Sequence, residues 1–244
     1  MAVFKMKIAG FVGEITSLFD STRDYCKDYL TEDAADFAYA VTADDLTFEQ
    51  AFLDREAAEE GFKPRRFTDP FLERAAIQRA FGEFLFEKDV LLLHGSLIAA
   101  DGEGYFFAAK SGTGKSTHTR FWQQLLGERA VIVNDDKPFF TVTSAGITAH
   151  GAPWSGKHGL HRNLSVPLKA ICLLERGEEN TICPAEDAEL LSMLLNQGGK
   201  PLDESKEARY IALTKQLLQR TPLWHLRCRK EAAAAEVAFS AMSE

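Results

Sequence analysis

Apolar and polar positions in the first third of the chain predict a small set of strands and helices. The two kinds of residue alternate over residues 3–19, which predicts a strand pair, and over residues 37–42, which predicts a further strand. Apolar side chains recur at helical spacing over residues 44–61 and 69–87, and the second helix is expected to pack against a sheet. Ser21 is expected to cap a short helix that runs to residue 30.

The middle of the chain is richer in strand patterns. Residues 90–100 and 105–109 are apolar runs on either side of a glycine-containing turn, which predicts a β-hairpin. Residues 130–133 predict a short buried strand, and residues 139–143 and 147–151 alternate around a second turn, which predicts another hairpin. Hairpins within a sheet bring antiparallel pairs with them, so we expect the sheet to be mixed.

The last third supplies elements that complete and cover this sheet. They are strands at residues 168–174 and 223–228, helices at 184–197 and 203–219 separated by a Gly-Gly-Lys-Pro break, and an alanine-rich helix at 231–242. The expected fold class is therefore α/β, a mixed sheet with flanking helices. We interpret residues 1–66 as a small α+β N-terminal region and residues 67–244 as the main domain.

Composition narrows the class of protein. The chain has 244 residues, of which 45% are hydrophobic and 26% charged, enough to bury a substantial core. Its formal net charge of −8 argues against bulk binding to nucleic acid or anionic membranes. With no apolar run of about 18 residues and no signal-peptide pattern, we expect a cytoplasmic protein. The four cysteines are widely spaced and suggest neither a disulfide framework nor a metal site.

Residues 109–117 carry the strongest motif, Ala-Lys-Ser-Gly-Thr-Gly-Lys-Ser-Thr. It follows an apolar strand and leads into a helix expected over residues 117–126, so backbone N–H groups and the helix dipole favour a phosphate there. This is the P-loop (Walker A) pattern, although Ala109 replaces its first glycine. Gly112 and Gly114 stand where the backbone must approach the phosphate. The alternative is an ordinary glycine-rich turn.

The pattern assigns a role to each polar group of the loop. Lys115 would reach the β and γ oxygens of a nucleotide, and the Ser116 hydroxyl would bind Mg²⁺. The residues expected to surround the phosphates are Ser111, Gly112, Thr113, Gly114, Lys115, Ser116 and Thr117.

Two further groups are candidates for the chemistry. Asp135 and Asp136 follow a buried strand, where successive side chains point to opposite sides, so one of them would face the phosphates unless the chain bends. The alternative is a turn with one solvated carboxylate. His94 ends an apolar run next to Gly95 and is either a hydrogen-bonded core residue or part of the active site.

The order of these elements resembles a known family. His94-Gly95-Ser96, a hairpin, Ser-Gly-Thr-Gly-Lys-Ser, a helix and then the acid pair resemble the catalytic core of HPr kinase/phosphorylase, and behind it the nucleotide-binding core of ATP-dependent phosphoenolpyruvate carboxykinase. The resemblance implies a P-loop core of the carboxykinase-like type. It also implies that Asp135 binds Mg²⁺ with Ser116 and that Asp136 accepts the proton of a substrate serine. It further implies that His94 lies in the active site; whether a second divalent ion binds near His94 is left open. Residues 1–66 do not match the N-terminal domain of HPr kinase.

Residues 150–163 are expected to form a mobile binding loop because they combine glycines, an aromatic residue and cations. Lys157 or Arg162 would steady either the γ-phosphate or an acidic end of the substrate, and Arg162 is the better candidate because a guanidinium binds phosphate with two parallel bonds. Trp154 is a candidate to cover a base or a peptide side chain. The two histidines at residues 158 and 161 lack the partners of a zinc site.

Two functions remain open from the sequence. The first is an ATP- and Mg²⁺-dependent serine kinase that acts on a small protein or peptide, with the reverse reaction left open. The second is a non-catalytic module that senses ATP or ADP for a protein partner. The sequence names neither the acceptor nor the oligomeric state, and a homo-oligomer is left open.

Overall fold

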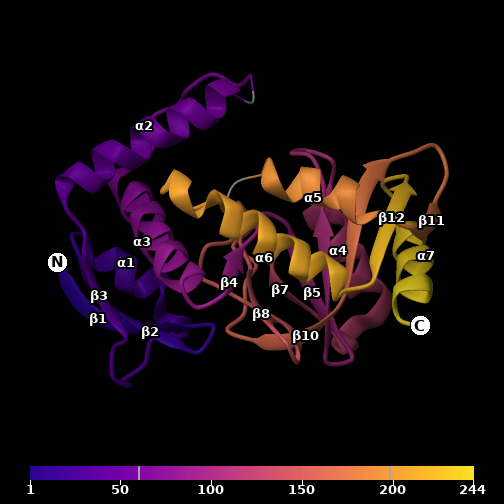
Figure 1. Cartoon of the computed structure of the whole chain (residues 1–244), viewed down its shortest axis with the longest axis horizontal. Coiled ribbons are helices and arrows are strands. Elements are labelled where there is room, and N and C mark those ends of the chain that lie inside the picture. Colours follow the sequence, from indigo (N-terminus) through magenta and orange to yellow (C-terminus); the bar gives the residue numbers. More distant parts are fainter. Residues whose placement is uncertain (60, 198) are drawn as a thin grey trace. The chain divides into compact units, whose positions relative to one another are not determined.

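The computed structural model describes residues 1–59, 61–197 and 199–244. Its contacts divide the chain into two compact units, Met1–Phe84 and Leu85–Glu244 (Figure 1). The boundary that we expected after residue 66 falls inside the first of these units, between helices α2 (Ala43–Glu59) and α3 (Asp69–Phe86). Glu60, in the helix expected over residues 44–61, and Gly198, in the expected break between two helices, lie outside the described residues.

The first unit contains a three-stranded sheet formed by β1 (Ala2–Ile8), β2 (Phe11–Ser17) and β3 (Phe37–Ala40). The strand pair predicted over residues 3–19 is confirmed as the antiparallel β1–β2 hairpin. β3 runs parallel to β2 because α1 (Asp20–Tyr25) and the short helix η1 (Lys27–Tyr29) carry the chain between them. The buried face of the sheet includes Met6, Ile8 and Ile15.

The predicted cap at Ser21 is wrong. Helix α1 begins at Asp20, and no side chain of its own caps it. The fully buried carboxylate of Glu73 on α3 accepts hydrogen bonds from the backbone N–H groups of Leu18 and Phe19 and from the Thr22 hydroxyl. Because these donors are satisfied by a residue far along the chain, a capping rule that considers only neighbouring residues does not identify Glu73.

The second unit is built on one mixed sheet. Among the described residues its strands are β4 (Val90–Leu92), β5 (Ser96–Ala100), β6 (Glu103–Ala108), β7 (Ala130–Asn134), β8 (Phe139–Thr143), β9 (Gly146–His150), β10 (Ser165–Arg176), β11 (Thr181–Pro184) and β12 (Leu223–Cys228). They lie in the order β4-β8-β9-β10-β6-β5-β7, with β12 paired to β10 and β11 paired to β12. Both predicted hairpins, β5–β6 and β8–β9, are confirmed.

The directions of these strands bring four strand ends to one edge of the sheet. β6 is parallel to β10, β10 is parallel to β12, and β5 is antiparallel to both β6 and β7. The carboxyl ends of β6, β7, β10 and β12 therefore share an edge, where β5 also begins. The segments that leave this edge hold the glycine motif, the acid pair and residues 228–230.

One predicted strand is two strands in the structure. The apolar run over residues 90–100 is divided between β4, which pairs with β8, and β5, which pairs with β6 and β7. Between them, Leu93 and Gly95 donate backbone hydrogen bonds to the carbonyls of Pro138 and Asp136. A Cβ on Gly95 would lie 2.3 Å from the Phe106 ring, so glycine is needed where the chain passes from β4 to β5. Both halves are buried and apolar, and the hydrophobic pattern therefore could not reveal the break.

Helices cover both faces of this sheet (Figure 1). Helices α5 (Asp187–Leu195) and α6 (Glu207–Gln219) pack on the face that includes Leu97, Phe106 and Ile171. Helices α4 (Lys115–Leu126) and α7 (Ala233–Met242) pack on the opposite face. The prediction of a mixed sheet with flanking helices is confirmed. In the part of the chain that the structure describes, every helix is too short or too polar to cross a bilayer.

Candidate functional site

The glycine motif connects β6 to α4. We call residues 109–114 the glycine loop. Gly112 and Gly114 have φ angles of 75° and 124°, in the left-handed region that favours glycine. Helix α4 begins at Lys115 directly after Gly114, so its first backbone N–H groups and the positive end of its dipole lie at the loop. The loop therefore offers a site for an anion.

Lys115 lies folded back under this loop. Its side chain is 8% exposed, and its Nζ donates a hydrogen bond to the Ala109 carbonyl over 3.0 Å. The same carbonyl accepts a hydrogen bond of 2.7 Å from Nε2 of Gln197, which follows α5. The ammonium group therefore lies directly beneath the loop, at the strand end where an anion would be bound.

Arg176, at the end of β10, holds the loop from its outer side. Its Nη2 donates to the Gly112 carbonyl over 2.6 Å, and its Nε donates to the Thr113 carbonyl over 3.3 Å. The C=O and N–H of a trans peptide point in opposite directions. By fixing two carbonyls, the guanidinium also sets the direction of the N–H groups of Thr113 and Gly114. No sequence motif pointed to Arg176, because it contacts the loop only in the folded chain.

Asn134 organises the turn that carries the acid pair. This fully buried side chain accepts hydrogen bonds at Oδ1 from the backbone N–H groups of Asp136 and Lys137, over 2.8 and 2.7 Å. Its Nδ2 donates to the carbonyls of Ala152 and Trp154. One amide therefore joins the acid pair to the segment around residue 152. Asn134 immediately precedes the two aspartates, but its role was not predicted from the sequence.

The two carboxylates point to different partners. Asp135 is buried, and its Oδ1 accepts a hydrogen bond of 2.8 Å from the Gly156 N–H. Its Oδ2 is buried and has no hydrogen-bond partner among the described residues. Burial raises the pKa of Asp135, although the Gly156 hydrogen bond opposes the shift.

Asp136 instead faces His94, whose Nε2 lies 3.2 Å from Asp136 Oδ1. Burial opposes ionisation of Asp136, but the His94 hydrogen bond and the ammonium groups of Lys137 and Lys115 outweigh burial and lower its pKa. Burial lowers the pKa of His94 and outweighs its contact with Asp136. At neutral pH the pair is therefore a neutral imidazole that donates from Nε2 to an ionised carboxylate. His94, Asp136 and Lys115 lie within electrostatic reach of one another.

The segment after β9 lies beside the acid pair. The Asp135 N–H donates to the Leu160 carbonyl over 3.2 Å, and the Arg162 N–H donates to the Val133 carbonyl over 2.9 Å. The side chains of Lys157 and Arg162 are exposed. Among the described residues, no hydrogen bond or ion pair links the Arg162 guanidinium to the acid pair or the glycine loop. Trp154, a candidate to cover a ligand, is buried against Phe139 with ring centroids 6.3 Å apart, so little of its ring is exposed to a ligand.

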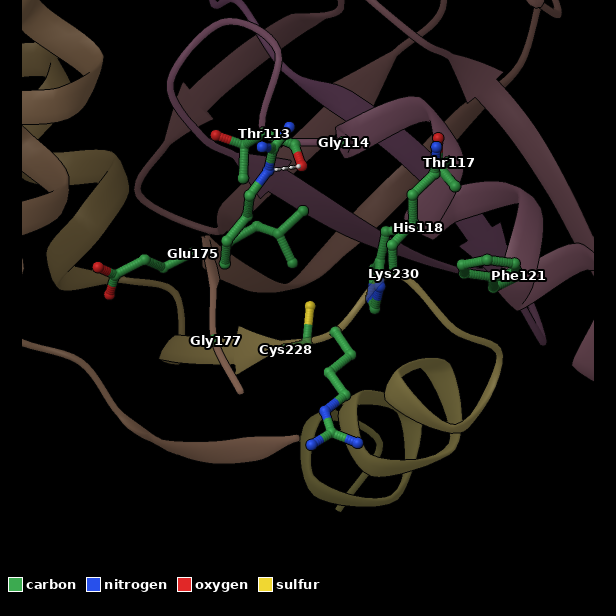
Figure 2. A pocket seen from close by; sticks show the side chains of 12 residues that line it. Thr113, Gly114, Thr117, His118, Phe121, Glu175, Gly177, Cys228 and Lys230 are labelled. Carbon is green, nitrogen blue, oxygen red and sulfur yellow. Dashed lines mark hydrogen bonds between the residues drawn. The ribbon is translucent and has the colours of Figure 1, made fainter. Parts of the chain in front are cut away.

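A cavity of ≈ 280 Å³ opens on the other side of the glycine loop. Figure 2 shows Thr113 and Gly114 above it, Thr117, His118 and Phe121 of α4 along one side, and Cys228 of β12 opposite. His118 accepts a hydrogen bond of 3.1 Å from the Trp122 indole, and burial lowers its pKa to about 4, so it is neutral at neutral pH. The lining of the cavity also includes Arg176, Arg229 and Lys230. The sequence did not predict a contribution from the C-terminal segment.

Comparison with known proteins places this region in a family. A family model described as "SynChlorMet cassette protein ScmC" matches residues 80–228, more than half of the chain. No curated protein matches the chain. Among solved structures, the HPr(Ser) kinase/phosphatase from Coxiella burnetii is similar at 10% identity and a TM-score of 0.28, over 52% of this chain and 88% of that one. A likeness of that degree is too distant to assign an activity.

Proposed function

This chain belongs to the family described as SynChlorMet cassette protein ScmC, and we propose that it is an ATP-dependent phosphotransferase that moves the γ-phosphoryl group of ATP to a serine of a small protein or peptide. One observation carries the proposal. A glycine loop at a helix N-terminus, a buried lysine and a pair of divergent carboxylates meet at one edge of one sheet. We further propose that the second unit is a P-loop core of the phosphoenolpyruvate carboxykinase-like type.

The nucleotide would bind with its phosphates on the glycine loop. Backbone N–H groups and the start of α4 would receive the phosphate oxygens, and Lys115 would leave the Ala109 carbonyl for the β and γ oxygens. The nucleoside would lie in the cavity between α4 and the ends of β10 and β12. Neutral His118 and the Phe121 ring give that cavity an uncharged wall suited to a base.

Ser116 and Asp135 would hold Mg²⁺. The residues fit a hard cation, because Asp135 has a buried carboxylate oxygen with no partner among the described residues. When bound, the ion would neutralise charge on the β- and γ-phosphates.

Asp136 would receive the proton of the acceptor. The serine Oγ attacks the γ-phosphorus, the bond to the oxygen bridging the β-phosphate breaks, ADP leaves, and the hydroxyl proton passes to Asp136. His94 donates a hydrogen bond to this carboxylate and would keep it oriented. We therefore assign His94 to positioning Asp136, which leaves a second divalent ion unnecessary.

The test separates binding from transfer. With a fluorescent ATP analogue, Lys115→Ala should weaken binding by about tenfold or more, since it removes the buried ammonium group at the base of the loop. Asp136→Asn should bind the analogue normally but lower serine phosphorylation of a peptide library by roughly 10²–10⁴-fold. Lys215→Ala, an exposed lysine on α6, is the matched control and should change neither.

Two outcomes would contradict this assignment. Normal ATP binding by the Lys115→Ala protein would remove the glycine loop as the nucleotide site. Tight ATP binding without transfer to any serine, in the wild type and the Asp136→Asn protein alike, would favour the alternative of a nucleotide-sensing module.

A further inference from the structure

Charge is distributed unevenly around the acid pair. Between Asp136 and Glu175 the sequence has no aspartate or glutamate, although the whole chain carries a net charge of −8. The cations in this stretch are Lys137, Lys157, Arg162 and Lys169. A stretch that contains cations but no carboxylates, in an otherwise acidic protein, favours anionic partners.

Two of these cations are exposed and available. Lys157 and Arg162 have exposed side chains, and neither forms an ion pair with any of the described residues. Lys169, in contrast, lies 4.0 Å from Glu103 on the neighbouring strand. Lys137 is half-buried next to His94 and Asp136, whose pKa values it lowers.

The backbone that carries these exposed cations is anchored to the acid pair. We call residues 156–162 the cationic loop. Its first residue donates to Asp135 Oδ1 over 2.8 Å, and its last donates to the Val133 carbonyl over 2.9 Å. Because both ends are tied to β7 and the turn after it, Lys157 and Arg162 are held near Asp135 and Asp136 rather than spread over a free loop.

The strand order places the cationic loop on the acceptor side. The strands run β12-β10-β6-β5-β7, and the glycine loop leaves the central β6. The cavity lies towards β10 and β12, whereas the cationic loop lies along β7. In phosphoryl transfer the attacking and leaving oxygens are roughly in line, so a nucleoside on one side requires the acceptor on the other.

We propose that the acceptor serine lies in an acidic peptide segment whose carboxylates bind Lys157 and Arg162. This proposal rests on the proposed function, since it identifies the second substrate of the same site. A guanidinium and a carboxylate form two parallel hydrogen bonds, and the lysine adds a flexible cation. A nucleic acid is disfavoured because only a few cations face an otherwise acidic surface.

The experiment uses two labelled peptides with the full chain. One contains glutamate and glycine residues around a single serine, and the other has glutamine at each glutamate position. Fluorescence anisotropy with Mg·ADP present should give tighter binding of the glutamate peptide by about tenfold, with an affinity that falls as salt is added. The double variant Lys157→Ala/Arg162→Ala should lose most of this preference, whereas Lys215→Ala should keep it.

Nucleotide binding is measured in the same proteins. Unchanged binding of a fluorescent ATP analogue by the double variant, together with weaker peptide binding, supports the inference. Equal affinity for the two peptides overturns it, as does an equal loss in the Lys215→Ala protein. Weaker ATP binding with normal peptide binding would assign the cations to the nucleotide instead. An oligonucleotide of matched charge that competes as well as the glutamate peptide would also overturn it. If Lys115→Ala leaves ATP binding normal, the proposed function itself fails, whatever the peptides do.

Discussion

At the scale of single residues, the buried amide of Asn134 connects two parts of the site. It accepts from the backbone of Asp136 and Lys137 and donates to the carbonyls of Ala152 and Trp154. A carboxylate at this position could not donate to the two carbonyls. An apolar side chain could neither donate to the carbonyls nor accept from the two N–H groups. The conformation of the acid pair therefore depends on an uncharged neighbouring side chain.

Truncation of this amide tests how much it contributes to the stability of the fold. Asn134→Ala leaves two buried and two partly buried backbone groups without their partner, and we expect a loss of about 2–4 kcal/mol in the free energy of unfolding. Urea unfolding followed by tryptophan fluorescence measures it. Gln216→Ala, an exposed amide on α6, is the control and should change stability by less than about 0.5 kcal/mol. Similar values for the two proteins would contradict the role of Asn134.

Arg176 acts on the glycine loop through geometry as well as charge. The Arg176→Lys protein keeps the charge but cannot donate from a planar guanidinium to the Gly112 and Thr113 carbonyls together. We expect the Kd for Mg·ATP to rise by roughly three- to tenfold, without a large change in stability. Titration with a fluorescent ATP analogue checks this. Arg120→Lys, on α4, should have the wild-type Kd, and an unchanged Kd in Arg176→Lys would show that charge alone suffices.

At the scale of elements, His150 joins three strands. It lies on β9 and shares hydrogen bonds of 2.8 Å with Thr141 Oγ1 on β8 and with Ser165 Oγ on β10. Burial lowers the pKa of His150 from 6.5 to about 4. The folded protein thus holds this imidazole neutral in a pH range where the unfolded chain would protonate it.

This shift predicts a pH dependence of stability. Between the two pKa values the unfolded state binds more protons, so stability falls as the pH falls from about 6.5 to about 4. The contribution of His150 over this range is roughly 3 kcal/mol. Urea unfolding at several pH values should give a shallower dependence for His150→Gln than for the wild type, whereas the exposed-site variant His158→Gln should follow the wild type. Identical slopes for His150→Gln and the wild type would contradict the assignment.

Local patterns predicted most of the elements but not their partners. The β5–β6 hairpin and α4 follow from apolar runs, a turn and a glycine motif that lie next to each other in the chain. The break before β5 was missed because β4 and β5 are both buried, and the cap of α1 was missed because Glu73 is distant in sequence. In the candidate site, the motif and the acid pair were visible in the sequence. Arg176 and Asn134 were not, because their contacts arise only when β10 and the segment after β9 are in place.

At the scale of the whole molecule, the tryptophans lie in one of the two compact units. The sequence has three, Trp122, Trp154 and Trp224, and all belong to Leu85–Glu244. The candidate site lies in the same unit. Tryptophan fluorescence therefore reports the unfolding of the part of the chain to which the nucleotide is proposed to bind.

Ligand linkage gives the corresponding prediction. Mg·ATP at about 100 times its Kd should raise the free energy of unfolding reported by tryptophan fluorescence by about 2.7 kcal/mol. The Lys115→Ala protein at the same nucleotide concentration should show a much smaller increase. An equal increase in both proteins would mean that the nucleotide binds elsewhere, and no increase in the wild type would mean that it does not bind.

The cavity beside the glycine loop has a consequence for biosynthesis. One of its walls is formed by residues 228–230, which leave the ribosome long after the glycine loop and the acid pair. β10 likewise receives β12 as a parallel neighbour only at this late stage. A nascent polypeptide therefore lacks this wall of the cavity until residues 228–230 have left the ribosome, so under the proposed function chains that stop before them should bind ATP poorly.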